Sequence, residues 1–171
     1  MAAANDSRST YFLFFPLLFM ALVIDIIRLP EIINPYRPDI LSLCVIFFAT
    51  FDPARVNIGW AWIAGLLLDL LTGAPLSQHA LCLALQVFLI LSQFQRFALF
   101  ALWQQILIIL VVNLLGHVLG YWISHLAGQV NYEESIAASS VVTAALWPVI
   151  SLLCLFLCRA LNLAPPAHKE N

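Results

Sequence analysis

Long apolar runs, separated by short polar stretches, constrain the fold of this chain more than any other feature. Six runs can be delimited, at residues 11–27, 40–51, 53–71, 80–91, 106–123 and 136–161. Only 9% of the residues are charged and 63% are apolar, whereas soluble domains average about 25% charged and about 45–50% apolar residues. A water-soluble fold of this size would lack the charge to solvate its surface. The sequence therefore predicts an all-α, polytopic membrane bundle of about six transmembrane helices.

The positive charges predict the orientation of this bundle. We expect one transmembrane domain over residues 11–161, between a disordered cytoplasmic tail at 1–10 and a cytoplasmic tail at 162–171. With the N-terminus inside, two positive residues lie outside, Arg28 and Arg37, and five lie in cytoplasmic stretches: Arg8, Arg55, Arg96, Arg159 and Lys169. Because positive residues favour the cytoplasmic side, we expect an N-in, C-in protein.

The second apolar run is the weakest part of this prediction. Residues 40–51 form a run of only 12 residues, which rises about 18 Å as a helix. A perpendicular span needs about 20 residues. We expect this helix either to thin the bilayer locally or to be shielded by its neighbours.

Proline, glycine and mixed aromatic residues predict several helix boundaries. Asp52 and Pro53 suit the start of the third helix, as N-cap and first residue. Gly73 suits the end of that helix. The stretch 92–105 mixes glutamine, arginine and aromatic residues, as expected at the headgroup level before the fifth helix. Pro148, beside Trp147, should kink or break the sixth helix.

Two acidic residues lie inside apolar runs. Asp69 lies one turn from the end of the third run, where both the hydrocarbon and the helix dipole disfavour a carboxylate. It therefore needs a compensating partner, and Arg28 and Arg37 lie at the same outer level. A contact with a partner protein and a proton site are the alternatives. Asp25 has Arg28 three residues later, which predicts a local ion pair.

Small residues mark faces where helices can approach closely. Gly59 and Gly65 lie on the third run, and the sixth run contains the pairs Ser139/Thr143 and Ser140/Ala144. Such faces pack against other helices of the same chain or against the helix of a partner. On the fifth run, Asn113 and His117 share one face. They predict hydrogen bonds between helices, with a substrate or proton site as the alternative.

The sequence offers no catalytic, metal or cofactor motif. Cys44, Cys82, Cys154 and Cys158 lie in apolar runs without a Cys-x-x-Cys spacing, so we interpret them as small hydrophobic residues. No nucleophile–base pair or phosphate loop is present, and the net charge of −2 gives no basic patch for nucleic acid. We therefore expect no enzyme, no cofactor, no metal and no nucleic-acid partner.

Several short motifs, in order, resemble the MreD family of bacterial rod shape-determining proteins over about residues 11–160. The matching runs are Asn34-Pro35-Tyr36-Arg37-Pro38-Asp39, Arg55-Val56-Asn57-Ile58-Gly59, Gly65-Leu66-Leu67-Leu68-Asp69-Leu70-Leu71-Thr72-Gly73, Ala101-Leu102-Trp103-Gln104-Gln105 and Ala145-Leu146-Trp147-Pro148. One departure follows Gly73, because family members often place a glycine where this chain has Leu76-Ser77.

The resemblance implies a non-enzymatic membrane subunit. The family works with MreC, a single-span protein, and connects MreB filaments to wall synthesis by RodA and its transpeptidase partner. The residues that the motifs indicate for partner binding or structure are Gly59, Gly65, Asp69, Gly73, Gln104, Gln105, Trp147 and Pro148. The family is also similar in fold to the substrate-binding subunits of energy-coupling-factor vitamin transporters, which implies an alternative function in binding a small molecule. That function would need Asp69, Asn113 and His117 to converge at one depth.

Overall fold

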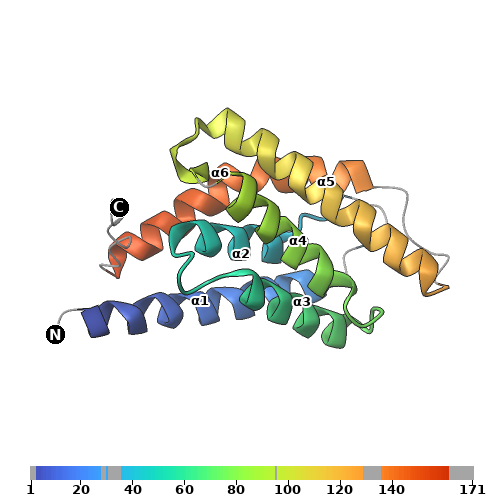
Figure 1. Ribbon diagram of the computed structural model, residues 1–171, viewed down its shortest axis with the longest axis horizontal. Helices are drawn as coiled ribbons and strands as arrows, with labels where there is room; N and C mark the ends of the chain where they lie inside the picture. Colours follow the sequence, from blue (N-terminus) through green and yellow to red (C-terminus); the bar gives the residue numbers. More distant parts are fainter. Residues whose placement is uncertain (1–2, 28–29, 31–35, 95, 129–135, 162–171) are drawn as a thin grey trace.

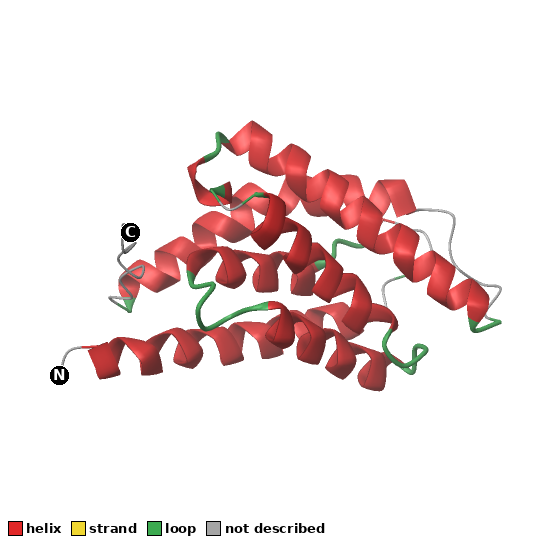
Figure 2. Cartoon of the chain, in the orientation of Figure 1, coloured by secondary structure: helices red, strands yellow, loops and turns green. Residues whose placement is uncertain are grey.

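The chain folds into a bundle of α-helices. The computed structural model describes residues 3–27, 30, 36–94, 96–128 and 136–161. Within them the helices are α1 (Ala3–Ile26), α2 (Ile40–Phe51), α3 (Ile58–Thr72), α4 (Gln78–Gln93), the short 3₁₀-helix η2 (Phe97–Leu99), α5 (Leu102–Leu126) and α6 (Ile136–Ala160). Figure 2 shows helices joined by loops throughout the described part. The predicted all-α bundle with six α-helices is confirmed.

The short helix α2 lies in the middle of the bundle (Figure 1), in contact with α1, α4 and α6. All nine residues from Leu41 to Ala49 are buried. On this helix Phe48 stacks edge-on against Phe14 of α1 at a centroid distance of 5.4 Å. A helix covered on every side needs no lipid-facing surface, so its 12 residues are compatible with the membrane. We predicted that this short helix either thins the bilayer or is shielded by its neighbours. In the structure the neighbouring helices shield it.

The start of α2 is held by two carboxylates. Asp39 is the N-cap and accepts a hydrogen bond from the Ser42 amide at 3.0 Å. Asp25, from the last turn of α1, accepts a second one from the Leu41 amide at 2.8 Å. The positive end of a helix dipole stabilises such carboxylates. The predicted partner of Asp25, Arg28, lies outside the described residues.

The connection from α2 to α3 contradicts one predicted boundary. Helix α3 begins at Ile58, with Asn57 as its N-cap, and not at Asp52-Pro53. After α2 the amides of Arg55 and Val56 turn back to the Asp52 carbonyl. The Asp52 carboxylate, buried beneath α1, pairs with the Arg55 guanidinium at 2.9 Å and accepts a hydrogen bond from Thr10. Because this carboxylate has a cation and a hydroxyl as partners, it does not cap α3.

Two other boundaries also differ from those predicted. Helix α1 already begins at Ala3, so most of the stretch expected to be a disordered tail is helical. Helix α5 begins at Leu102, four residues before the predicted start, and only η2 separates it from α4 within the described residues. In η2, Phe97 is buried against Trp147 at a centroid distance of 5.5 Å. Leu99 of η2 and Trp103 of α5 are exposed. The buried Phe97 brings the chain back to the bundle, so α5 can begin early.

Helix α6 runs without interruption from Ile136 to Ala160 through Pro148. The prediction of a break at this proline is therefore wrong. Neighbouring helices and hydroxyl side chains support prolines in membrane helices.

The helices differ in whether they could cross a bilayer unaided. Among the described residues, α5 and the stretch Ala137–Ala160 of α6 are long and apolar enough to do so. The other apolar stretches, Thr10–Ile26, Ile40–Phe51, Ile58–Thr72 and Gln78–Gln93, are shorter. Large apolar side chains are nevertheless exposed on α1, α3, α5 and α6. This surface is the one expected for a bundle that has lipid as its solvent.

Candidate functional site

The motif from Gly65 to Gly73 forms one side of a tight hairpin between α3 and α4. A Cβ atom added at Gly65 would lie 2.4 Å from the Cα of Ala80 and 2.5 Å from the carbonyl oxygen of His79. Both contacts are with the backbone of α4, so no side chain could move away to make room. Gly65 therefore permits the two helix backbones to touch, as small residues do in membrane helix pairs.

Asp69 caps the start of α4 from one turn further along α3. Its Oδ1 accepts hydrogen bonds from the backbone amide of His79 at 2.9 Å and lies 2.7 Å from His79 Nδ1. Its Oδ2 accepts a longer bond from the Ala80 amide at 3.4 Å. The residue is only 1% exposed. The first amides of a helix need such acceptors and carry the positive end of its dipole, so both terms favour the carboxylate.

The predicted arginine partners of Asp69 are not the ones found. Arg37 donates to the carbonyl of Ile24 at 3.1 Å, and Arg28 lies outside the described residues. His79, ten residues after Asp69, and the backbone of α4 take their place. Asp69 meets these groups because the hairpin returns α4 directly to the last turn of α3.

Gly73 ends α3 in the way that its position predicts. It adopts a left-handed conformation with φ of 70°, and its amide bonds to the Asp69 carbonyl at 3.0 Å. Nothing lies within 4 Å of an added Cβ atom, so the requirement for glycine here is conformational and not steric. Gly65, Asp69 and Gly73 thus share one role, which is to build the α3–α4 hairpin.

Ser77 occupies the place where the family resemblance leads one to expect a glycine. It is the only non-glycine residue with positive φ among those described, at 77°, and its side chain makes no capping hydrogen bond to α4. A left-handed conformation costs an L-residue about 1–2 kcal/mol.

Ser77→Gly should therefore raise the free energy of unfolding by about 1 kcal/mol, measured by denaturation in mixed micelles. Gly128 already has positive φ, so Gly128→Ser is the reverse control and should destabilise the protein. A Ser77→Gly protein no more stable than the parent would contradict this account.

A second group of predicted residues joins α5 to α6. Trp147 donates its indole N–H to Gln105 Oε1 at 2.9 Å, and Gln105 Nε2 donates to the Phe100 carbonyl at 2.9 Å. Gln104 lies in the first turn of α5, where its Oε1 accepts a hydrogen bond from the Ala101 amide at 3.2 Å. Gln105 therefore ties η2, α5 and α6 together, and Gln104 caps α5.

The small residues of α6 and the first glycine of α3 also have local explanations. Ser139 donates its hydroxyl to the Arg37 carbonyl at 2.7 Å, and Thr143 accepts from the Asp39 amide at 2.9 Å. They dock α6 on the segment that leads into α2. Gly59 is exposed, and its amide bonds to the Asn57 side chain at 3.0 Å. These contacts support packing within the chain for the small residues on α6.

Sequence reasoning missed one polar contact and mispredicted another. Ser42 of α2 hydrogen-bonds to Gln86 of α4, and both residues are buried. Single polar residues in apolar runs were the available signal. Asn113 was expected to hydrogen-bond to another helix, but its side chain has no hydrogen-bond partner among the described residues.

None of the hydrogen bonds of Asp69 reaches Asn113 or His117 on α5, so these three residues are not joined into one polar site. No group of three metal-ligating side chains occurs in the described part of the chain.

Comparison with known proteins agrees with this architecture. The family profile described as rod shape-determining protein MreD matches residues 6–157. The rod shape-determining protein MreD of Haemophilus influenzae (strain ATCC 51907 / DSM 11121 / KW20 / Rd) is 24% identical over 134 residues, which are 78% of this chain and 83% of that relative. No solved structure matches the chain significantly. The chain belongs to the MreD family of rod shape-determining proteins, which are non-enzymatic, polytopic membrane proteins.

Proposed function

We propose that this protein is a structural subunit of the bacterial rod complex, located in the inner membrane. There it binds MreC and helps to couple cytoplasmic MreB filaments to peptidoglycan synthesis by RodA and its transpeptidase partner. One structural observation supports this proposal beyond family membership. The motif residues Gly65, Asp69, Gln105 and Trp147 are used to tie the chain's own helices together. The chain therefore offers partners a rigid bundle with apolar helix faces.

Two exposed faces suit a single membrane-spanning helix of MreC. On α3, Ile63, Leu67 and Leu70 are exposed and spaced by four and three residues; on α6, Val149, Leu152 and Phe156 have the reverse spacing. Residues at these spacings lie on one side of a helix. Each face can pack against a partner helix in the membrane by shape alone.

Site-specific photo-crosslinking tests the proposal. A photoreactive residue is placed at one exposed position at a time on α3 and α6, and MreC is purified in mild detergent. We expect crosslinks to MreC at neighbouring positions of one face and weak or absent crosslinks on the other. Leu68, which is buried on α3, is the matched control and should crosslink only within the chain. Failure of the parent protein to co-purify with MreC, together with no crosslink at either face, would overturn the proposed MreC contact.

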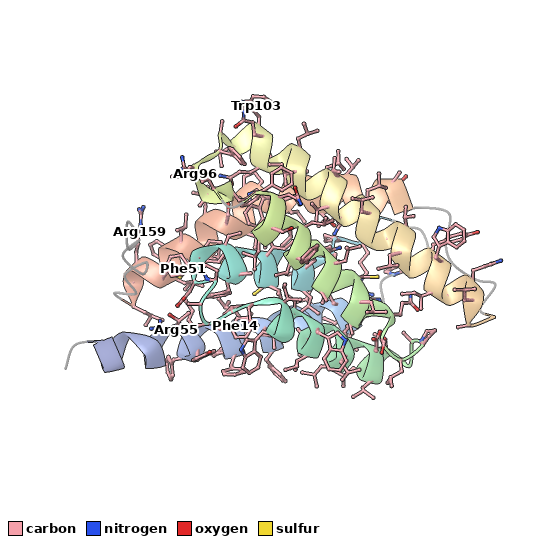
Figure 3. The ribbon with its side chains drawn as sticks, in the orientation of Figure 1. Phe14, Phe51, Arg55, Arg96, Trp103 and Arg159 are labelled. Carbon is pink, nitrogen blue, oxygen red and sulfur yellow. The ribbon has the colours of Figure 1, made fainter. Side chains whose placement is uncertain are left out.

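The orientation follows from the charges. Figure 3 shows Arg55, Arg96 and Arg159 toward the end of the bundle where α1 begins and α6 ends, and Arg37 precedes α2 at the other end. Arg8 and Lys169 lie outside the residues whose side chains are described. We propose that the arginine-rich end faces the cytoplasm. A C-terminal green fluorescent protein should then fluoresce, whereas activity of a C-terminal alkaline phosphatase would show the opposite orientation.

A further inference from the structure

A group of polar side chains lies inside the bundle around Gly116 of α5. A Cβ atom added at Gly116 would lie 2.3 Å from Nε2 of Gln86 on α4. The other end of that amide, Oε1, hydrogen-bonds to Ser42 of α2. The Gln86 side chain therefore bridges from α2 to the surface of α5, and its amide nitrogen is directed at the glycine.

Asn113 and His117 flank this glycine on α5. Asn113 is 1% exposed, and neither its Oδ1 nor its Nδ2 has a hydrogen-bond partner among the described residues. The Nε2 atom of His117 is buried and also has no partner there. Residues four apart on a helix are neighbours on its surface, so these two side chains lie next to each other. Three unsatisfied polar atoms therefore lie on one face of α5.

Polar atoms without hydrogen-bond partners destabilise an apolar bundle. An amide removed from water without a replacement hydrogen bond loses its hydration with no compensating interaction. The nearby Ser42–Gln86 pair shows that a buried side-chain amide in this bundle can obtain a hydrogen-bond partner. Asn113 contributes both a donor and an acceptor, and His117 contributes a further nitrogen. A molecule that serves all three atoms must both donate and accept hydrogen bonds, and it must be small.

We propose that Asn113 and His117 bind buried water at the α5 surface beside Gly116. Buried waters in proteins typically make two to four hydrogen bonds to polar groups that would otherwise be unsatisfied. The three atoms of Asn113 and His117 supply that number. The site gives α5 a hydrated stretch within a bundle whose other interior contacts are mostly apolar.

Hydroxyl-radical labelling by a short X-ray pulse tests this site in the intact protein. In lipid nanodiscs, bound water next to a side chain produces radicals that oxidise it. We expect oxidation of His117 in the parent protein, and a several-fold decrease in Asn113→Leu, which removes two of the three polar atoms. His125 is exposed near the end of the same helix, so its oxidation should be equal in both proteins and reports the radical dose.

Two outcomes would overturn the proposal. His117 could remain unlabelled in the parent protein, which would show a dry site whatever the variant does. Alternatively, Asn113→Leu could leave His117 oxidation unchanged, which would show that the imidazole meets bulk solvent. Trp147, 2% exposed, monitors folding, because its oxidation would rise if the variant opened the bundle. If Trp147 oxidation does rise in Asn113→Leu, Asn113→Ser is used instead. Serine keeps a donor and an acceptor in less volume, so His117 should remain labelled in that variant.

Discussion

Replacing Gly65 with alanine should force α3 and α4 apart and lower the free energy of unfolding by about 3 kcal/mol. One added carbon would overlap the Cα and amide nitrogen of Ala80, at 2.4 and 2.5 Å. Backbone atoms at a helix start cannot be displaced without moving the helix. The change is measured by denaturation of the purified protein in mixed micelles and by its abundance in the membrane.

Gly59→Ala is the matched control for this substitution. It makes the same chemical change on the same helix, but its added Cβ would meet only the Asn57 side chain, at 3.2 Å. Alanine has a higher helix propensity than glycine by up to about 1 kcal/mol. We therefore expect Gly59→Ala to be neutral or slightly stabilising. Equal stability of the two variants would show that the close approach of α3 and α4 has no energetic importance.

Asp69→Leu should be comparably damaging, with a loss of about 3 kcal/mol or more. Leucine has the same number of side-chain heavy atoms, also branched at Cγ, but leaves the first amides of α4 and the His79 ring without their acceptor. Asp69→Asn keeps one oxygen acceptor and should lose about half as much.

His79→Ala separates the two roles of Asp69. It removes the imidazole contact and keeps both backbone amides. Because the His79 side chain is 38% exposed, that contact should contribute about 1 kcal/mol or less. The expected order of stability is parent, His79→Ala, Asp69→Asn, Asp69→Leu. A His79→Ala protein as unstable as Asp69→Leu would show that the imidazole contact, and not the helix cap, holds the hairpin.

The sequence indicated residues of this hairpin that need a structural explanation, but it did not indicate what they contact. A lone carboxylate in an apolar run, between two glycines, indicated that Asp69 needs a partner and that Gly73 ends a helix. It could not indicate His79, because that contact depends on how sharply the chain returns after Gly73. An arginine at the same depth was the simplest expectation, and backbone amides were overlooked as partners for a charge.

The same limit explains the other differences. Asp52-Pro53 has the composition of a helix start, yet Asp52 pairs with Arg55 and Thr10, a residue 42 positions earlier. Contacts this distant cannot be read from local patterns. The fold class and the family could be predicted, because apolar run length and motif order are properties of the sequence itself. The Ser42–Gln86 bond could not be predicted, since it requires knowing which faces of α2 and α4 meet.

The burial of α2 has a consequence for biogenesis. Helix α2 leaves the ribosome before α3, α4 and α5, whereas α6, one of the helices that cover it, follows all three. The docking contacts of Ser139 and Thr143 with residues 37 and 39 join segments more than 100 positions apart. Throughout translation of α3, α4 and α5, one side of α2 therefore lacks its native neighbour. The native packing around α2 can therefore form only after α6 has been synthesised, and a chain that stops before α6 would leave one side of α2 without its native neighbour.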